Sequence, residues 1–400
     1  MIDAISHFES EKIGFRNKLT QIGNRIDFET NQQNVHTPWE LSKDMITQLS
    51  TSVNILDKTI CVLNLEFVEV LCYDFKVNPE HIYFITDCKQ KANVMKHPRY
   101  KGVNDVETDY LYMKLENNMK FDVICGNPPY QNGSGNKGSN NTLWDKFVKK
   151  SLELVKENGY LCMVHPSGWR AVGGQKNVGE LLKSKQMLHL EIHDEQDGHK
   201  IFGVSSRYDW YVLCNKPNSN PTKIKDQTGY TYESDISKMT FIPNYGVDII
   251  APLLATNLAD RIEIIKNCAY HSHNFNHNGE IKISREQTAK HKYPCVYSVN
   301  RKNEPKFLWS SFNNNGHFGI PKVIFGSGST GFFIDINGDY GQTEFARSIV
   351  DSPEHLPKIA EALNSEKFKN VIKIMSVGAS EINVEILKCF RKDFWKQFID

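Results

Sequence analysis

The stretch Phe121-Asp122-Val123-Ile124-Cys125-Gly126-Asn127-Pro128-Pro129-Tyr130 decides how the rest of the chain is organised. Its first part is a short apolar run of the kind typical of a buried parallel strand. Asn127 and the two prolines end that run, because proline lacks a backbone donor and has a fixed φ. The sequence therefore predicts a strand that ends in a rigid loop, where doubly wound sheets bind ligands outside the carboxyl ends of their strands.

The four loop residues suit recognition of a flat ring that carries an amine. Asn127 offers an amide oxygen and a backbone carbonyl as acceptors, and Pro128 and Pro129 stiffen the turn. Tyr130 supplies a planar face for a stacked base. A structural Pro-Pro turn with an incidental tyrosine is the competing interpretation, and the tetrapeptide taken alone favours neither.

The composition is that of an ordinary soluble protein of two or three domains, with 400 residues, 40% hydrophobic and 24% charged. The formal net charge is +1, so any nucleic-acid binding must come from local basic patches. The nine cysteines form no CxxC pair and indicate reduced core residues rather than zinc ligands or disulfides. Since no apolar segment has the length of a membrane span and no signal-peptide core is present, we expect a cytoplasmic protein without membrane contact.

The N-terminal part predicts helices. Residues 1–34 are polar with sparse apolar positions and suggest a helical extension. The pattern at 36–40 is that of a helix start, with Thr37 as the cap, Pro38 in the first turn and Glu40 completing a capping box. A plain helix entrance accounts for this pattern without any functional role.

Buried runs and helical runs then alternate, which is the mark of an α/β unit with a parallel sheet. The expected elements are strands at 59–63, 81–85, 106–111 and 121–125, with a helix at 67–71 after the first strand. Each strand ends near a polar acceptor, and these acceptors are Asn64, Glu66, Asp87, Asp109 and Asn127. One acid at a strand end is usually only solvated, but several at the same edge fit ribose hydroxyls and an adenine amine.

The α/β pattern continues to residue 216. Residues 131–141 predict a mobile loop, residues 143–155 a helix that ends by Gly159, and three more strands are expected at 160–164, 188–192 and 209–213. The connection from His193 to Tyr208 contains histidines and acids, but its spacing matches no zinc pattern, so we predict no metal site.

After a linker-like stretch at 217–221 the chain loses its βαβ rhythm, and we expect a second domain of short strands and a late helix at 359–374. Its segment Lys290–Phe307 interleaves five lysines and arginines with aromatic residues, which favours contact with nucleic acid. The Gly-Ser-rich stretch Gly316–Gly331 suits a groove-facing loop. A solvated surface gives a similar composition.

Together these segments resemble the gamma-class N6-adenine DNA methyltransferases of restriction-modification type, from Thr37 to Leu213 for the catalytic part and more loosely beyond it. The resemblance implies a Rossmann-like, S-adenosyl-L-methionine-dependent methyltransferase domain with a mixed sheet at 35–216. It implies a C-terminal α+β target-recognition domain at 217–400 that binds double-stranded DNA. A separate restriction endonuclease is left open as a partner, and the recognition sequence and oligomeric state are not readable.

The resemblance also assigns roles to residues. Its catalytic positions match Asn127, Pro128, Pro129 and Tyr130, with Phe202 as the later aromatic that packs against a flipped adenine. Its cofactor-binding positions match Thr37, Pro38, Asp87 and Asp109, and Asn64 and Glu66 in the turn after the first strand offer further polar contacts to the cofactor.

One departure concerns the turn after the first strand. The family has a glycine there, so that the cofactor can approach the backbone, but this chain reads Cys61-Val62-Leu63-Asn64-Leu65-Glu66-Phe67. The leading interpretation is an enzyme, a site-specific methyltransferase acting on adenine N6. The alternatives are a methyltransferase for another acceptor, such as cytosine N4 or RNA, and a non-catalytic DNA-binding protein with a degenerate cofactor pocket.

Overall fold

The computed structural model describes residues 12–21, 36–115, 119–131, 142–174, 177–266, 283–326, 331–377 and 382–399. The chain divides into two compact units. The first consists of Met1–Trp169 and Gly173–Met239, and the second of Arg170–Val172 and Thr240–Asp400. Each unit is described by itself below.

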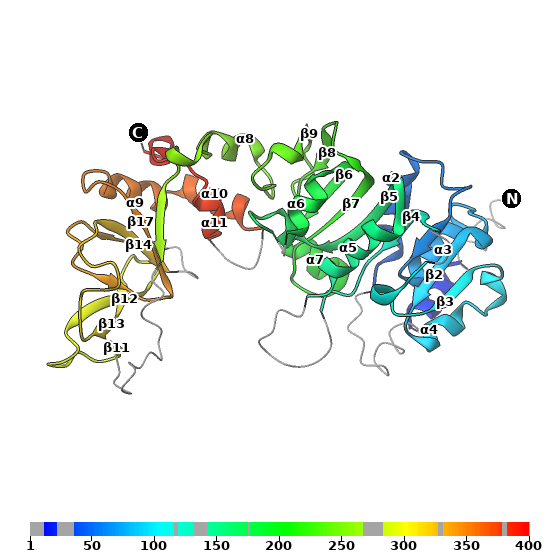
Figure 1. Ribbon diagram of the computed structural model, residues 1–400, viewed down its shortest axis with the longest axis horizontal. Helices are drawn as coiled ribbons and strands as arrows, with labels where there is room; N and C mark the ends of the chain where they lie inside the picture. Colours follow the sequence, from blue (N-terminus) through cyan, green and yellow to red (C-terminus); the bar gives the residue numbers. More distant parts are fainter. Residues whose placement is uncertain are drawn as a thin grey trace. The chain divides into compact units, whose positions relative to one another are not determined.

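The first unit is built on a nine-stranded sheet, drawn from blue to green in Figure 1, with the strand order β3-β2-β1-β4-β5-β7-β6-β8-β9. Strands β1 to β5 run parallel, β7 is antiparallel to its neighbours β5 and β6, and β9 is antiparallel to β8. The strands are β1 (Ile60–Val62), β2 (Ile82–Thr86), β3 (Asn104–Glu107), β4 (Phe121–Gly126), β5 (Val155–Pro166), β6 (Lys185–His193), β7 (Tyr208–Pro217), β8 (Thr222–Lys225) and β9 (Thr231–Ser234).

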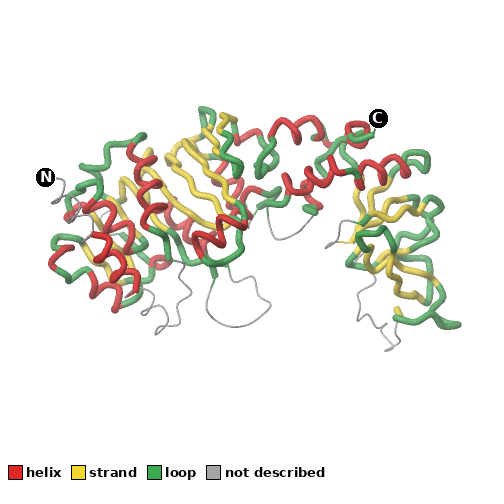
Figure 2. The backbone as a smooth tube through the Cα atoms, turned by 180° about the vertical axis from the view of Figure 1, so that it is seen from behind, coloured by secondary structure: helices red, strands yellow, loops and turns green. Residues whose placement is uncertain are grey.

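Helices cover both faces of this sheet, as Figure 2 shows in red against the yellow strands. They are α2 (Trp39–Ser50), α3 (Leu65–Tyr73), α4 (Lys89–Val94), α5 (Trp144–Leu154), α6 (Val178–Lys183) and α7 (Glu195–Phe202). The apolar stripe of α2, with Met45, Ile46 and Leu49 fully buried, packs with α3 on one face. The predicted α/β fold with a mixed sheet is confirmed.

Three local predictions in this unit are wrong. Thr37 does not cap α2, because Pro38 occupies the N-cap and no side chain bonds to the helix start. The strand expected at 106–111 is β3 at Asn104–Glu107, followed by a 3-10 turn at Tyr110–Tyr112. The helix predicted at 143–155 is α5 (Trp144–Leu154), but the helix end expected at 157–159 is wrong, because β5 begins at Val155, which pairs with Phe121 of β4.

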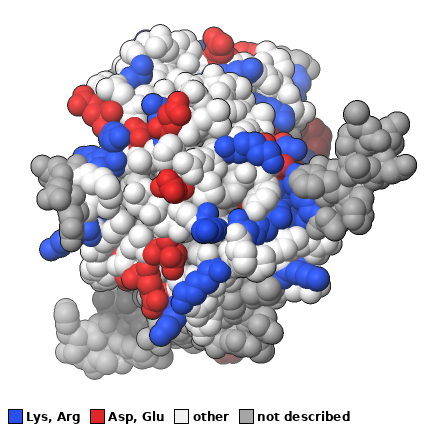
Figure 3. Space-filling model, turned by 90° about the vertical axis from the view of Figure 1, so that its right-hand side faces the viewer, with Lys and Arg blue, Asp and Glu red and all other residues white. Residues whose placement is uncertain are grey.

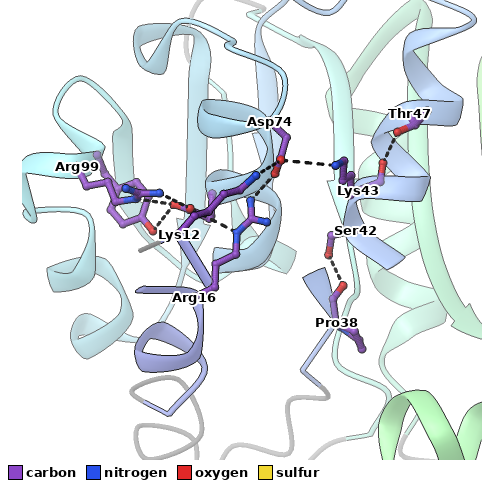
Figure 4. Close-up of polar contacts among 10 residues, drawn as sticks. Lys12, Arg16, Pro38, Ser42, Lys43, Thr47, Asp74 and Arg99 are labelled. Carbon is purple, nitrogen blue, oxygen red and sulfur yellow. Dashed lines mark hydrogen bonds and ion pairs between the residues drawn. The ribbon is translucent and has the colours of Figure 1, made fainter. Parts of the chain in front are cut away.

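The described part of the N-terminal extension is a helix at residues 12–21 that lies against α3 through charges. Lys12 and Arg16 form ion pairs with Asp74, and Figure 4 shows both side chains pointing toward it. Arg16 Nε also lies 3.6 Å from Oε1 of the buried Glu69, which accepts two hydrogen bonds from Arg99 at 2.6 and 3.0 Å. These contacts fix the helix to the unit, whereas residues 1–11 and 22–35 lie outside the described residues.

The unit boundary differs from the expected division after residue 216. Strands β8 and β9 hydrogen-bond into the first sheet, β8 through its parallel pairing with β6, so the units divide between Met239 and Thr240. The linker-like composition at 217–221 marks a turn between two strands of one sheet.

The second unit contains two four-stranded sheets, β10-β17-β14-β15 and β11-β13-β12-β16. Its strands are β10 (Glu263–Lys266), β11 (Ile283–Ser284), β12 (Tyr293–Val299), β13 (Pro305–Ser310), β14 (Lys322–Gly326), β15 (Phe332–Asp335), β16 (Gly341–Gln342) and β17 (Ala346–Val350). Its helices are α8 (Val247–Ile250), α9 (Leu356–Asn364), α10 (Glu366–Met375) and α11 (Val384–Leu387). The α+β character expected of the C-terminal part is confirmed.

The single late helix predicted at 359–374 is two helices, α9 and α10. Ser365 has extended backbone angles and separates them, and its hydroxyl accepts a hydrogen bond from the Phe368 N–H at 3.1 Å as the cap of α10. The apolar faces of α9 and α10 pack into the same core, so the apolar residues keep a helical spacing across Ser365 and the sequence pattern does not show the break.

Candidate active site

The predicted loop after β4 lies at the carboxyl edge of the first sheet. Parallel pairing brings the end of β1, and with it Asn64, beside the end of β4 and Asn127. Across β5, the register pairs Pro166 with Tyr208 at the start of β7, and Tyr208 with His193 at the end of β6. Residues far apart in sequence thus meet at one edge.

Asn127 is buried, with 3% of its surface exposed, and its backbone is held by Asn64. The Asn127 N–H donates to Asn64 Oδ1 at 2.6 Å, and Asn64 Nδ2 donates to the Asn127 carbonyl at 3.0 Å. The side-chain amide of Asn64 is therefore engaged on both sides by one residue. We call this pair of hydrogen bonds the Asn64–Asn127 clasp.

Gly126 allows the β1–α3 turn to come this close. Its φ is +152°, and a Cβ at this position would stand 2.7 Å from Leu63 Cβ and 2.8 Å from Asn64 Oδ1. Only Leu63 and Asn64 separate β1 from α3. Gly126 therefore lets Leu63 and Asn64 pack directly against the end of β4, whereas the turn after β1 itself carries no glycine.

Tyr130 lies beside Asn127 with its hydroxyl inside. Burial raises the pKa of Tyr130, although hydrogen bonding with the Asn127 side chain lowers it, so the phenol stays protonated at neutral pH. The Tyr130 carbonyl accepts from the Leu143 N–H at 3.1 Å, and Gln131 bridges to Thr142. These contacts tie the loop to the start of α5, and the rest of the predicted mobile loop, 132–141, lies outside the described residues.

Phe202 ends α7, where Gly203 follows with a φ of +71°. Its ring meets Tyr208 edge to face, at 4.9 Å between centroids and 81° between planes. His193 stacks on the same tyrosine at 4.4 Å and 2°. Burial, together with the carboxylates of Asp197 and Glu191, raises the pKa of Tyr208. Tyr208 thus lies between Phe202 and His193.

Sequence reasoning missed Tyr208 and His193 as members of this edge. Both stand at the ends of predicted strands, so their positions were available, but their partnership depends on the antiparallel insertion of β7 between β5 and β6.

Acidic groups fix the His193 ring. Its Nδ1 is 3.0 Å from Asp197 Oδ2 and its Nε2 is 3.4 Å from Glu191 Oε1. Burial lowers the pKa of His193, but the two carboxylates outweigh it, so the net shift is upward. Lys225 donates to Glu191 at 2.9 Å and helps to keep that carboxylate charged.

The residues predicted on the cofactor side fall into two groups. Thr37 and Pro38 precede α2, and the Thr37 N–H donates to Glu66 Oε1 at 3.2 Å while His36 forms an ion pair with the same carboxylate. Thr37 is fully buried, and its hydroxyl has no hydrogen-bond partner among the described residues. A buried hydroxyl of this kind fits a polar ligand group at that position.

Asp87 and Asp109 form the second group, at the ends of β2 and β3. Both side chains are exposed, and Asp109 accepts from the Leu111 N–H at 2.9 Å as the cap of a 3-10 turn. They follow two neighbouring parallel strands, and their carboxylates fit a ligand that carries hydroxyl or ammonium groups. The side-chain amide of Asn64, also predicted on the cofactor side, bonds to the Asn127 backbone.

His165, on β5 behind the site, is a fully buried structural residue. It stacks on Trp144 at 4.2 Å between centroids, and its Nε2 is 3.2 Å from the Tyr211 hydroxyl. Burial lowers the pKa of His165 to about 4, so the ring is neutral at physiological pH.

Residues 46–202 match the family model described as Eco57I restriction-modification methylase. This segment belongs to that family. It contains β1 to β5, the Asn127 loop and Phe202, so the resemblance inferred from the sequence is confirmed.

Curated relatives agree with this assignment. The chain is 50% identical over 54 residues to an uncharacterized adenine-specific methylase of Mycoplasma pneumoniae, covering 13% of this chain and 12% of the relative. It is 29% identical over 166 residues to modification methylase CviBIII of Paramecium bursaria Chlorella virus NC1A, covering 40% of each. The chain therefore spans less than half the length of these relatives.

Two solved structures align at low identity. The type IIG restriction endonuclease BpuSI aligns with 92% of this chain and 61% of its own, at 9% identity and a TM-score of 0.48. The N-methyltransferase NodS of Bradyrhizobium japonicum WM9 aligns with 45% of this chain and 96% of its own, at 8% identity and a TM-score of 0.30.

The segment predicted to contact nucleic acid forms the β12–β13 hairpin and its flanks in the second unit. Lys292 lies over the Tyr293 ring at 5.3 Å and Lys306 over Tyr297 at 5.9 Å, and both lysines are exposed. On the face of the molecule in Figure 3, by contrast, basic and acidic side chains are interspersed, as expected from a net charge of +1.

Among the helices that the structure describes, none has the length and apolarity needed to span a membrane. The described residues also hold no group of three or more His, Cys, Asp or Glu side chains placed to bind a metal. The His-rich run at 271–277 lies outside them.

Proposed function

We propose that this protein is a site-specific DNA methyltransferase that transfers a methyl group to N6 of an adenine flipped out of the duplex. One observation carries the proposal: a buried Asn127, held by the clasp and followed by Pro-Pro-Tyr, stands at the carboxyl edge of a methylase-family sheet. Phe202 and Tyr208 lie at the same edge and supply aromatic faces.

In this proposal the amine is held by acceptors. The Asn127 side-chain oxygen and the Pro128 carbonyl accept hydrogen bonds from adenine N6 and direct its lone pair toward the methyl donor. No strong base is required, because the N6 proton becomes acidic once the C–N bond has formed and then passes to water, and positioning supplies much of the rate. Pro129 keeps the loop rigid.

Tyr130 and Phe202 stack on the two faces of the adenine. Each stacked ring contributes about 1–3 kcal/mol toward the cost of extruding the base. Tyr208, edge-on to Phe202, supports that ring from behind.

The family implies S-adenosyl-L-methionine as co-substrate, and when bound it supplies an electrophilic methyl group. The acceptors that would hold it are Glu66, Asp87 and Asp109, with Thr37 and Pro38 closing one side. The unpartnered buried hydroxyl of Thr37 and the exposed carboxylate of Asp87 support this placement.

The second unit, from Thr240 onward, would serve target recognition, because residues 217–239 of the expected domain belong to the first unit. The lysine-aromatic pairs of the β12–β13 hairpin support contact with double-stranded DNA through phosphates and stacked bases. A separate restriction endonuclease as a partner follows from the family name alone.

The test is methyl transfer from labelled S-adenosyl-L-methionine to unmethylated genomic DNA, followed by detection of N6-methyladenine. Asn127→Ala should abolish transfer while DNA affinity stays within a few-fold. Unchanged turnover in that variant would refute the proposed role of Asn127. Label found on cytosine N4 or in RNA would show that the enzyme methylates that acceptor instead of adenine N6.

A second candidate is a non-catalytic DNA-binding protein, favoured by the turn after β1, which has no glycine and is filled by Leu63 and Asn64. Calorimetric titration with S-adenosyl-L-methionine separates the two, since a degenerate pocket gives no binding heat.

A further inference from the structure

The turn after β1 differs from that of the family, and the structure indicates what replaces the glycine. We propose that Asn64 is a positioning residue that holds the catalytic Asn127 in place, rather than a ligand of the cofactor. This inference rests on the proposed function and adds a residue that acts through another.

The clasp controls both backbone angles of Asn127. The Asn127 N–H belongs to the peptide plane before its Cα, and the Asn127 carbonyl belongs to the plane after it. Because Asn64 bonds to both, at 2.6 and 3.0 Å, it fixes φ and ψ of Asn127 together. These angles set the direction of the Asn127 Cα–Cβ bond and the path of the chain into Pro128, and the two acceptors proposed for the amine project from these positions.

Asparagine is suited to this task because its amide both accepts and donates. Aspartate of the same shape accepts from the N–H but places a second oxygen against the Asn127 carbonyl. Gly126 completes the arrangement, since any side chain there would collide with Leu63 and with Asn64 Oδ1. The glycine on β4 and the amide on the β1–α3 turn thus form one unit.

The experiment compares wild type with Asn64→Asp. We expect the single-turnover rate of methyl transfer, at saturating S-adenosyl-L-methionine and DNA, to fall on the order of 10²-fold, the usual effect of a misplaced reacting group. The calorimetric Kd for S-adenosyl-L-methionine should stay within a few-fold. Asn78→Asp is the matched control, because exposed Asn78 only accepts from the Glu80 N–H and keeps that bond as aspartate.

Two results would overturn the inference. An unchanged single-turnover rate in Asn64→Asp would remove the positioning role, and a weakened cofactor Kd with an unchanged saturated rate would make Asn64 a cofactor ligand. If Asn64→Asp does not fold, Asn64→Ala replaces it, since alanine removes both bonds of the clasp without adding a charge and should lower the single-turnover rate by a similar factor. Failure of the proposed function itself is distinct, because wild type would then methylate no DNA.

Discussion

Replacement of His165 should change how the stability of the first unit depends on pH. The ring is fully buried and burial lowers its pKa to about 4, against an ordinary value of 6.5. Between these two values the unfolded chain binds a proton that the folded protein does not. Stability therefore falls as pH drops from 6.5 toward 4, and it is unaffected by this group above 6.5.

The size of the effect follows from the two pKa values. The wild-type protein should lose about 2 kcal/mol through His165 by pH 5 and about 3 kcal/mol by pH 4. His165→Phe keeps the stack on Trp144 but leaves the Tyr211 hydroxyl without its partner. That loss costs about 1–3 kcal/mol at every pH, so the variant starts less stable and approaches or overtakes wild type in acid.

Urea denaturation of both proteins at pH 7, 6, 5 and 4 measures this difference, followed by tryptophan fluorescence. The gap in unfolding free energy should narrow steadily below pH 6.5. A gap that stays constant down to pH 4 would mean that His165 titrates normally, and it would refute the reasoning.

Two further predictions concern aromatic support and a buried charge. Tyr208→Leu should slow methyl transfer roughly tenfold, because Phe202 loses its edge-to-face partner. The variant should also give a smaller rise in fluorescence from 2-aminopurine placed at the target adenine. Tyr230→Leu, at an exposed site, is the control and should change neither quantity. Lys322→Met leaves the buried Asp335 without its 2.6 Å ion pair and should lower the unfolding free energy, measured by thermal denaturation, by about 3–5 kcal/mol. A loss under about 1 kcal/mol would show that this ion pair does not stabilise the second unit.

The sequence predicted the sheet because its evidence is local. Each buried strand of the first unit is an apolar run, and Asn127-Pro128-Pro129-Tyr130 marks the end of β4 by backbone chemistry alone. Asp87 follows β2 for the same reason, whereas β3 is a polar, half-exposed strand whose bounds the sequence did not predict.

What the sequence did not reveal depends on contacts across the sheet. The clasp joins residues 64 and 127 through strand pairing, and no spacing rule links them. Tyr208 contacts His193 because β7 pairs with β6, and the sequence does not show which strands are neighbours. The boundary between the units lies later in the chain than predicted for a similar reason. Strand β8 pairs with β6 in the first sheet, but the turns that flank β8 suggest from the sequence alone that it belongs to the next domain.

The close approach of Gly126 to Leu63 and Asn64 has a consequence for how this protein can vary. The side chain at position 64 occupies the space that a side chain at position 126 would need, so the two positions cannot change independently. A larger residue at 126 would displace Asn64, and the loop that carries Asn127 would then lose the clasp. Among relatives with the same two-residue turn we expect an amide at the first position to occur with glycine at the second. A search for methylases of this kind gains more from that pair than from a glycine motif after the first strand.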